Sequence, residues 1–192
     1  ATSIKAPSST KNAGGTRDPE RHQVKKGSEW YFGMKAHIGV DAGTGYIHSV
    51  TATPANVHDI VETHKLIRDD DEVLYGDAGY LGIEKREEIK QDQHKSQMEY
   101  RINKRPGKLR CAGNSSNIWQ QWDKYIENRK SSVRSKVEHP FRIVKIIFGY
   151  SKTAYRGLKK NLARLQILFA SANLYMCAKA GGFDRNLLHV QV

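Results

Sequence analysis

The sequence predicts an α/β fold, in which helices pack on a β-sheet, from three patterns. Apolar and polar residues alternate over residues 34–40, and a run rich in β-branched and aromatic residues follows at 46–53 after a glycine-containing turn. Both runs are typical of strands joined as a hairpin. A helical stretch then precedes the short apolar run 73–76, and from residue 119 onward apolar residues recur every three or four positions, as in helices.

The first 30 residues show little sign of regular structure. Residues 2–6 are the one candidate strand, and residues 7–30 are predicted to be a loop, because they are poor in apolar side chains. In the strand 34–40, polar residues such as Lys35 and His37 alternate with apolar ones. This alternation predicts a strand that is buried on one face only.

The middle of the chain alternates between helix and strand. Asn56 is expected to cap a helix that runs to about Arg68, and the strand 73–76 follows it, which suggests a crossover connection. A charged helix at residues 84–93 and a short strand at 98–103 are predicted next.

The C-terminal part is predicted to be helical in two runs. The first runs over residues 119–148, where Pro140 is expected to kink the helix or to start a new one. The second covers residues 158–176 and is ended by a pair of glycines. The order of elements fits one mixed sheet flanked by helices, with residues 1–180 as one domain and 181–192 as a C-terminal tail.

Charge is the main feature of the composition. The chain carries 32 Lys and Arg against 20 Asp and Glu, a net charge of +12 over 192 residues. This charge favours a polyanionic partner, with nucleic acid ahead of an anionic membrane surface. No apolar run approaches the roughly 20 residues that a membrane-spanning helix needs, so no membrane span is predicted. The two cysteines, Cys111 and Cys177, form no CxxC pair, which favours free thiols in a reducing cytoplasm.

Two carboxylates stand out by their surroundings. Asp77 directly follows the predicted strand 73–76 and is flanked by Gly76 and Gly79, which let a ligand approach the backbone closely. Glu138 lies on a basic, amphipathic stretch that is predicted to be helical. An acid at a strand end and an acid on a distant helix can meet and hold Mg²⁺. In a basic chain, the obvious anionic substrate for such a metal site is nucleic acid.

The same residues have plainer interpretations on local pattern alone. Asp77 also fits a turn or cap after a strand. Arg134, Glu138, Arg142 and Lys145 are spaced to share one helical face, so Glu138 also fits a solvated face with weak ion pairs.

Other polar residues give weaker signals. Asp59 fits a first-turn helix acid that the helix dipole favours. The histidines match no zinc-ligand spacing. Basic segments with aromatic residues recur at 25–32, 105–110 and 150–160. Their cations could neutralise phosphates and their rings could stack on bases, or they could form a generic basic surface.

Longer blocks of the sequence resemble a known family, the bacterial insertion-sequence DDE transposases of the insertion-sequence-five group, in the insertion-sequence-four-like superfamily. The similarity extends to about residue 175. The blocks that carry it occur in the family's order. They are residues 6–12, 17–20, 22–23, 25–27, 30–41, Ala55-Asn56-Val57-His58-Asp59, Gly76-Asp77-Ala78-Gly79-Tyr80, 105–108, Lys136-Val137-Glu138-His139-Pro140-Phe141-Arg142, 148–150 and 155–158.

The resemblance implies a ribonuclease-H-like catalytic domain that cuts DNA at element ends and joins the freed 3′-OH to a target, using Mg²⁺ or Mn²⁺. It implies DNA as partner, a homo-oligomer in the active complex, no membrane association, and a location in the bacterial cytoplasm at the nucleoid. It maps the second acid of the family onto Asp77 and the third onto Glu138, as catalytic and metal-binding residues.

The resemblance also implies DNA-binding residues. The family signature Tyr-x₂-Arg-x₃-Glu-x₆-Lys maps its Arg onto Arg134 and its Lys onto Lys145, with Ser131 in the Tyr position. On this basis and on charge, the residues assigned to DNA binding are Arg134, Lys136, Arg142, Lys145 and Lys108.

One departure concerns the first acid of the family, which would stand immediately before Ala1. The chain is therefore expected to be an N-terminally truncated transposase, catalytically inactive as it stands. The alternatives are a non-catalytic DNA-binding remnant or regulator of the full-length enzyme, a simple nuclease of the same fold, and a basic protein of an RNA particle.

Overall fold

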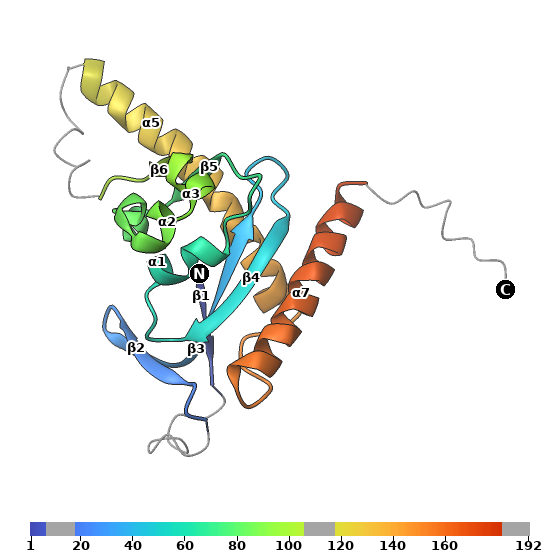
Figure 1. The fold of residues 1–192 in the computed structure, drawn as a ribbon. Coiled ribbons are helices and arrows are strands. Elements are labelled where there is room, and N and C mark those ends of the chain that lie inside the picture. The colour runs from blue at the N-terminus through green and yellow to red at the C-terminus, as the bar shows by residue number, and fades with distance from the viewer. Residues whose placement is uncertain (7–17, 106–117, 182–192) are drawn as a thin grey trace.

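The computed structural model describes residues 1–6, 18–105 and 118–181, and these form two sheets with helices around them (Figure 1). The larger sheet has four strands and the smaller has two. The α/β class predicted from the sequence is confirmed. Within the described residues, no helix is both long enough and apolar enough to cross a membrane.

The four-stranded sheet is antiparallel and is built around one long strand. Strand β3 pairs with β1, β2 and β4 along different parts of its length. Where β1 and β2 flank it, β3 has Gly33, at which a Cβ would collide with the carbonyl oxygen of Ile4. The strands are β1 (Thr2–Lys5), β2 (His22–Lys26), β3 (Glu29–Val40) and β4 (Ile47–Pro54).

The second sheet is a parallel pair, β5 (Val73–Gly76) and β6 (Glu99–Ile102). Short helices connect it to β4 and connect its two strands. These are α1 (Asp59–Glu62), η2 (Thr63–Lys65), η3 (Ala78–Tyr80), η4 (Ile83–Lys85), α2 (Glu87–Lys90) and α3 (Gln93–Gln97). The predicted single mixed sheet is therefore wrong for the described strands, because no ladder joins the two sheets.

The C-terminal part is helical. It consists of α5 (Ile118–Arg134), the 3₁₀ turn η5 (Ser135–Val137), α6 (Glu138–Arg142), the π-helical turn η6 (Ile143–Ile147) and α7 (Leu158–Lys179). Helices α6 and α7 pack on the larger sheet, whereas α5 contacts β5 of the smaller sheet. Pro140 lies in the first turn of α6, where its missing N–H is not needed, so the prediction of a new helix there is confirmed. In Figure 1, α7 lies along the sheet beside β4, whereas α5 extends away from the body.

Two apolar clusters hold these layers together. The larger one lies between the four-stranded sheet and helices α6 and α7, and includes Ile4, Met34 and Leu165. Phe141 and Phe169 meet edge to face in it, with ring centroids 5.8 Å apart. The smaller cluster, beside the two-stranded sheet, consists of Ile67, Ile83, Ile89 and Met98.

Several predicted elements agree with the structure. The hairpin is present as β3 and β4, the strand 73–76 matches β5, and the strands predicted at 2–6 and 98–103 are β1 and β6 with small changes of bounds. The second C-terminal helix, predicted at 158–176, is α7.

Three predictions of local structure are wrong. The loop predicted for 7–30 contains β2 and the start of β3 within its described part, because polar residues suffice for a hairpin at the sheet margin. The helix expected from Asn56 starts only at Asp59, after His58, and gives way to a 3₁₀ turn. The helix predicted at 84–93 is interrupted by extended backbone at Arg86 and Asp92. Most of the predicted basic loop 105–110, and the tail after Gly181, lie outside the described residues.

A buried asparagine ties α7 to the segment that precedes it. Asn161 is fully buried, and its Nδ2 donates to the carbonyls of Tyr155 and Gly157, both at 2.6 Å. Asn161→Ala leaves these carbonyls without this donor, so we expect a loss of about 2 kcal/mol in the free energy of unfolding, measured by urea denaturation. Gln166→Ala, on the exposed side of α7, is the control and should change stability little. Equal losses in the two variants would contradict the assignment.

Candidate active site

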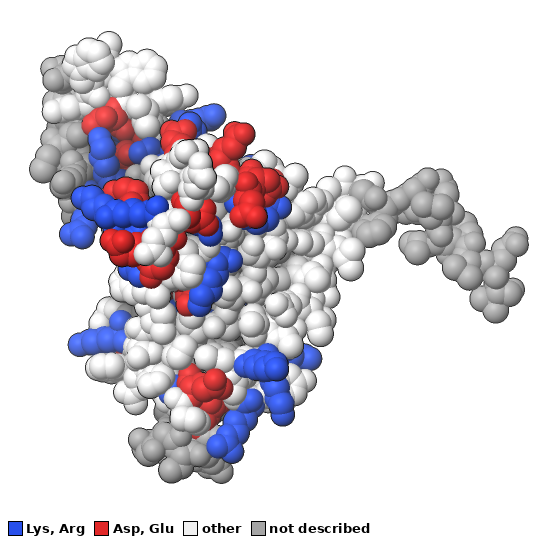
Figure 2. All heavy atoms as spheres, viewed as in Figure 1, with Lys and Arg blue, Asp and Glu red and all other residues white. Residues whose placement is uncertain are grey.

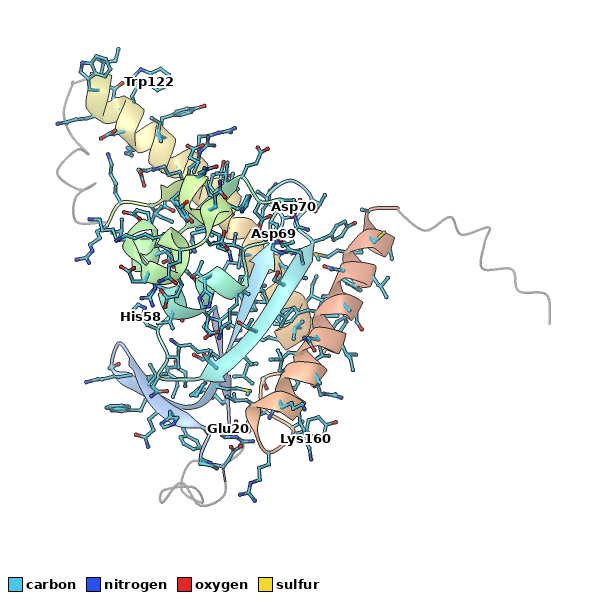
Figure 3. The ribbon with its side chains drawn as sticks, viewed as in Figure 1. Glu20, His58, Asp69, Asp70, Trp122 and Lys160 are labelled. Carbon is cyan, nitrogen blue, oxygen red and sulfur yellow. The ribbon has the colours of Figure 1, made fainter. Side chains whose placement is uncertain are left out.

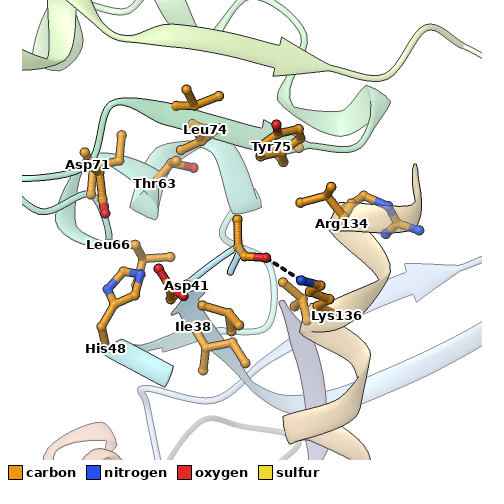
Figure 4. Close-up of a pocket in the computed structure, with 18 of the residues that line it drawn as sticks. Ile38, Asp41, His48, Thr63, Leu66, Asp71, Leu74, Tyr75, Arg134 and Lys136 are labelled. Atoms are coloured by element: carbon orange, nitrogen blue, oxygen red, sulfur yellow. Dashed lines mark hydrogen bonds between the residues drawn. The ribbon is translucent and has the colours of Figure 1, made fainter. Parts of the chain in front are cut away.

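The two carboxylates singled out in the sequence line the same cleft. This cleft has a volume of about 510 Å³ and lies between the β3–β4 hairpin, β5 and the junction of α5 with α6 (Figure 4). Asp77 enters it from the end of β5, and Glu138 from the first turn of α6. Two residues far apart in the sequence thus line one cleft.

Asp77 has a local structural role as well. It caps the 3₁₀ turn η3, and its Oδ1 accepts a hydrogen bond of 2.8 Å from the backbone N–H of Gly79. The preceding Gly76 is closely packed, because a Cβ there would lie 2.8 Å from Cδ1 of Ile102, which would have to move. The carboxylate of Asp77 therefore caps the turn η3 and lines the cleft at the same time.

Glu138 is held loosely. Its side chain is 70% exposed, and its ion pair with Arg134 joins Oε1 to Nη1 at 3.9 Å, at the limit of such contacts. An exposed pair of this kind adds little stability. The carboxylate is therefore available to a ligand in the cleft.

The cleft is acidic although the protein is strongly basic. Its lining includes three cations, Arg68, Arg134 and Lys136. Among the described residues, seven acids line it: Asp41, Asp59, Asp70, Asp71, Glu72, Asp77 and Glu138. Elsewhere on the face shown in Figure 2, blue and red side chains are interspersed. A local excess of carboxylates favours cations in this one place.

The basic residues assigned to DNA binding are in different situations. Arg134 lines the cleft, and Arg142 is exposed on α6. Nζ of Lys136 donates to the carbonyls of Ala42 and Gly43, at 2.5 and 3.1 Å, which attaches the α5–α6 junction to the β3–β4 turn. Nζ of Lys145 donates to Oγ1 of Thr2 at 2.5 Å. Lys108 lies outside the described residues.

These cations do not share one regular α-helix as their spacing predicted. The backbone changes from α-helix to 3₁₀ turn after Arg134, and from α-helix to π-turn after Arg142. The π-turn adds a residue to the helical turn and so rotates the side chains beyond it. Lys145, inside this turn, reaches the first strand of the sheet instead of solvent.

A second hollow of about 530 Å³ adjoins the cleft. Asp77, Asp59, Tyr80 and Arg134 line both. Ser131, which stands in the Tyr position of the family signature, lines the second hollow, and its Oγ accepts a hydrogen bond of 3.2 Å from Asn103. Asp77 and Arg134 therefore stand at the boundary between the two hollows.

The ion pair between Lys35 and Asp59 has no counterpart among the sequence predictions. Lys35 is 8% exposed, and its Nζ donates to Oδ1 of Asp59 at 2.9 Å and to the carbonyl of Val57 at 2.7 Å. Burial pushes the pKa of Asp59 up, but the hydrogen bond from Lys35, with the charges of the Ala1 amino group, Lys35 and His37, outweighs it and lowers the pKa. Asp59 is thus an ionised cleft residue held from the sheet, and more than a first-turn acid.

The sequence did contain an indication of this ion pair, namely the polar residues that alternate along β3 and form one face of it. That face is predicted to be exposed, but Lys35 and His37 are both buried, as are Met34 and Ala36 on the other face. The prediction of a half-buried strand is therefore wrong. A lysine and a histidine inside a strand that is covered on both sides need polar partners, and only the three-dimensional structure shows which.

The cleft offers oxygen donors of the kind that Mg²⁺ and Mn²⁺ prefer. Asp77 and Glu138 are the two that the sequence assigns to the metal, and both open into the cleft. Over residues 1–6, 18–105 and 118–181, no three His, Cys, Asp or Glu side chains stand close enough to enclose an ion together. The donor chemistry fits a divalent metal, with two protein carboxylates as the assigned donors.

Comparison with known proteins identifies the family. The family model of the transposase DDE domain matches residues 1–174, nearly the whole chain. The chain therefore belongs to this family. No solved structure matches it.

The buried histidine beside this site should make stability depend on pH. Burial is the main cause that lowers the pKa of His37 to about 4. In the unfolded chain this histidine has its ordinary pKa of about 6.5, so below that pH it takes up a proton that the folded protein excludes. The free energy of unfolding should therefore fall between pH 6.5 and 4, by up to about 3 kcal/mol. Urea denaturation across this range measures it.

A pair of variants controls this measurement. His37→Gln should flatten the pH dependence, whereas replacing His22, which is exposed, should leave it as it is. An unchanged curve in His37→Gln would refute the assignment of the pH dependence to this histidine.

Proposed function

As a member of the transposase DDE-domain family, this chain is, we propose, the catalytic part of an insertion-sequence transposase of the insertion-sequence-five group. It cleaves DNA at the ends of the element and transfers the freed 3′-OH to target DNA. The observation that carries the proposal is the presence of Asp77 and Glu138 in one acidic cleft of a basic protein. We propose residues 1–180 as the catalytic domain, acting on DNA in the bacterial cytoplasm as part of a homo-oligomer.

The order of the strands along the chain supports a ribonuclease-H-like plan for this domain, although no ladder joins its two described sheets. Three antiparallel strands, β4, β3 and β1, lie side by side, and a parallel pair follows in the chain. Ala1 lines the same cleft as Gly76 and Asp77, so the beginning of β1 and the end of β5 face each other across it. This is the place where that plan gathers its acids.

Asp77 and Glu138 are the residues that would hold Mg²⁺ or Mn²⁺. Such an ion supplies Lewis acidity, which activates a water or hydroxyl and neutralises charge on the phosphate. The carboxylate of Asp77 is oriented for this by the N–H of Gly79, and that of Glu138 is free to adjust because it is exposed.

Arg134 is the cation best placed to position the scissile phosphate. It lies beside Glu138, and it lines both hollows. Its planar guanidinium can donate two parallel hydrogen bonds to phosphate oxygens. Arg142, exposed further along the helical segment, can contact the DNA backbone outside the cleft.

The first acid of the family corresponds to the position immediately before Ala1. Side chains of a strand alternate in direction, so a residue there points to the same side as Thr2 and Ile4. On that side Thr2 contacts Lys145, and Ile4 packs in the cluster that contains Phe141. A carboxylate at this position would therefore face the helices that carry Glu138, which supports it as the third acid.

Catalysis should require all three acids. A chain that carries aspartate before Ala1 should nick plasmid DNA containing the element ends when Mg²⁺ or Mn²⁺ is added, and join the ends to a target. Asp77→Asn or Glu138→Gln should each lower the rate on the order of 100-fold or more, because charge stabilisation at the phosphate is lost. Glu84→Gln, an exposed acid outside the cleft, is the control. Nicking that persists in both cleft variants would reject the assignment.

The chain without the added aspartate tests the second candidate function, which is binding without cutting. It is expected to bind DNA with similar affinity and to cut it far more slowly. Equal cutting by both chains would mean that the third acid lies elsewhere. Binding with no cutting by either chain would favour a DNA-binding regulator.

The affinity for DNA should depend steeply on salt. Removing one phosphate contact should reduce the slope of log K against log salt concentration by about 0.9. Arg134→Gln and Arg142→Gln should each show this reduction in a fluorescence anisotropy titration with duplex DNA. Lys90→Gln, on α2 and paired with Glu87, is the matched control and should leave the slope unchanged. A flat salt response of the unmodified chain would contradict backbone contact altogether.

A further inference from the structure

Helix α5 presents large aromatic side chains to solvent near its outer end. Trp119 is 77% exposed, and Trp122 and Tyr125 are each 55% exposed. Ile118 and Ile126 extend the same surface, at 62% and 46%. In Figure 1 this end of α5 stands away from the body, and Figure 3 shows Trp122 there. We call these five residues the α5 aromatic face.

The five residues form one stripe because of the helical period. With about 100° per residue, positions 118, 119, 122, 125 and 126 fall on one side of the helix. Trp122 and Tyr125 are already in contact edge to face, with centroids 5.7 Å apart. The opposite side carries Glu127, which is buried against Asn103 and Lys104. An apolar stripe of this size, exposed among polar residues, marks an interaction surface.

The charge around the stripe selects the partner. Residues 103–105 and 118–136 contain seven Lys and Arg against two acids, Asp123 and Glu127. Both acids are already paired, Asp123 with Lys104 at 2.8 Å and Glu127 with Lys130 at 2.9 Å. A second copy of this helix would bring like charges together. A polyanion with apolar faces is complementary to it, and unpaired nucleic acid is such a partner.

The stripe is continuous with the cleft. Arg129 follows Trp122 by seven residues on the same side of the helix, and Val133 follows Arg129 by four. Val133 and Arg134 line the cleft with Asp77 and Glu138. The distance along the helix from residue 122 to 134 is about 18 Å, at 1.5 Å per residue. A strand whose phosphate lies in the cleft can therefore reach the aromatic rings.

We propose that the α5 aromatic face binds unpaired bases of the DNA strand that leaves the cleft, by stacking them on Trp119, Trp122 and Tyr125. The proposal depends on the proposed function for its substrate, and it is independent of the cutting chemistry. It assigns to α5 the holding of a single-stranded end next to the site, and it predicts a preference for unpaired over duplex DNA.

Tryptophan fluorescence can test this directly, because the chain has three tryptophans. Trp30, on β3, is 66% exposed and has Lys25 6.0 Å from its ring, so it is a matched control outside the α5 aromatic face. Trp30→Phe leaves only the two reporters on α5, and the double change Trp119→Phe with Trp122→Phe leaves only Trp30. Each protein is titrated with oligo-dT and with a duplex of equal length, without divalent metal.

We expect strong quenching by oligo-dT in Trp30→Phe, weaker quenching by the duplex, and little change in the protein that retains Trp30. The double change Trp119→Ala with Trp122→Ala should weaken oligo-dT binding by at least about fivefold, while Trp30→Ala has little effect. Far-UV circular dichroism checks that the exposed substitutions leave the fold intact.

Three results would overturn the proposal. One is equal quenching of the Trp30 reporter, and another is equal quenching by duplex and oligo-dT. The third is an emission of Trp30→Phe that changes with protein concentration in the absence of DNA, which would mean that a second copy covers the face. The cutting assay separates the two proposals. Quenching by oligo-dT without any cutting would support the stacking site and not the proposed function. If the alanine double variant cuts DNA and binds oligo-dT with unchanged affinity, the proposed function is supported and the stacking site is rejected.

Discussion

The ion pair between Lys35 and Asp59 is the interaction on which the site depends. Lys35 lies on the central strand of the larger sheet, at a position buried on a face that also contains His37. Withdrawing an ammonium group from water is costly unless a partner compensates it. The carboxylate of Asp59 and the carbonyl of Val57 provide that compensation. The start of α1 is consequently held against the sheet.

Tyr80 and the turn η3 lie between this attachment and Asp77. Tyr80 lines both hollows together with Asp59 and Asp77. Its pKa is raised by burial first, and then by the charges of these two acids. Helix α1 and the turn η3, which Asp77 caps, are in contact. On the other side of the cleft, Lys136 attaches the helix junction to the β3–β4 turn. Polar contacts thus tie α1 to the sheet and the junction that precedes Glu138 to the β3–β4 turn, and Asp77 follows α1 through the contact between α1 and η3.

Local patterns in the sequence were sufficient to predict the elements that depend on neighbouring residues. The hairpin and β5 follow from alternation and from short apolar runs, and Asp77 follows from its place after a strand and between glycines. Their surroundings allowed Asp77 and Glu138 to meet at one metal, and the family resemblance assigned both to the same catalytic site. Local pattern alone allowed a solvated helix face for Glu138, and that helix is in fact irregular.

Long-range contacts account for the features that local patterns do not predict. Alternation in β3 suggested an exposed polar face, since nothing local shows that α1 covers it. The same holds for Lys145, whose partner Thr2 is at the other end of the chain. The predicted helix at 84–93 ends where Asp92 caps the next helix by accepting a hydrogen bond from the N–H of Lys95. A cap of this kind competes with continuation of the helix, and it is hard to recognise within a run of charged residues.

The separation of charge explains how a basic protein can contain an acidic cleft. Several of the seven acids are already compensated by cations: Arg68 binds Asp70 and Asp71, and Lys35 binds Asp59. Asp77 and Glu138 have weaker partners, a backbone N–H and a distant guanidinium. A phosphate would be repelled by these two carboxylates unless a cation lies between them.

Under the proposed function, the cations that attract DNA are those of α5 together with Arg134 and Arg142. Long-range attraction therefore comes from residues other than those that face the phosphate. Under the proposed function, affinity for DNA and the ability to cut it are therefore separate properties. The first would depend on these cations and on salt, and the second on a divalent cation that offsets the repulsion between the two carboxylates and the phosphate.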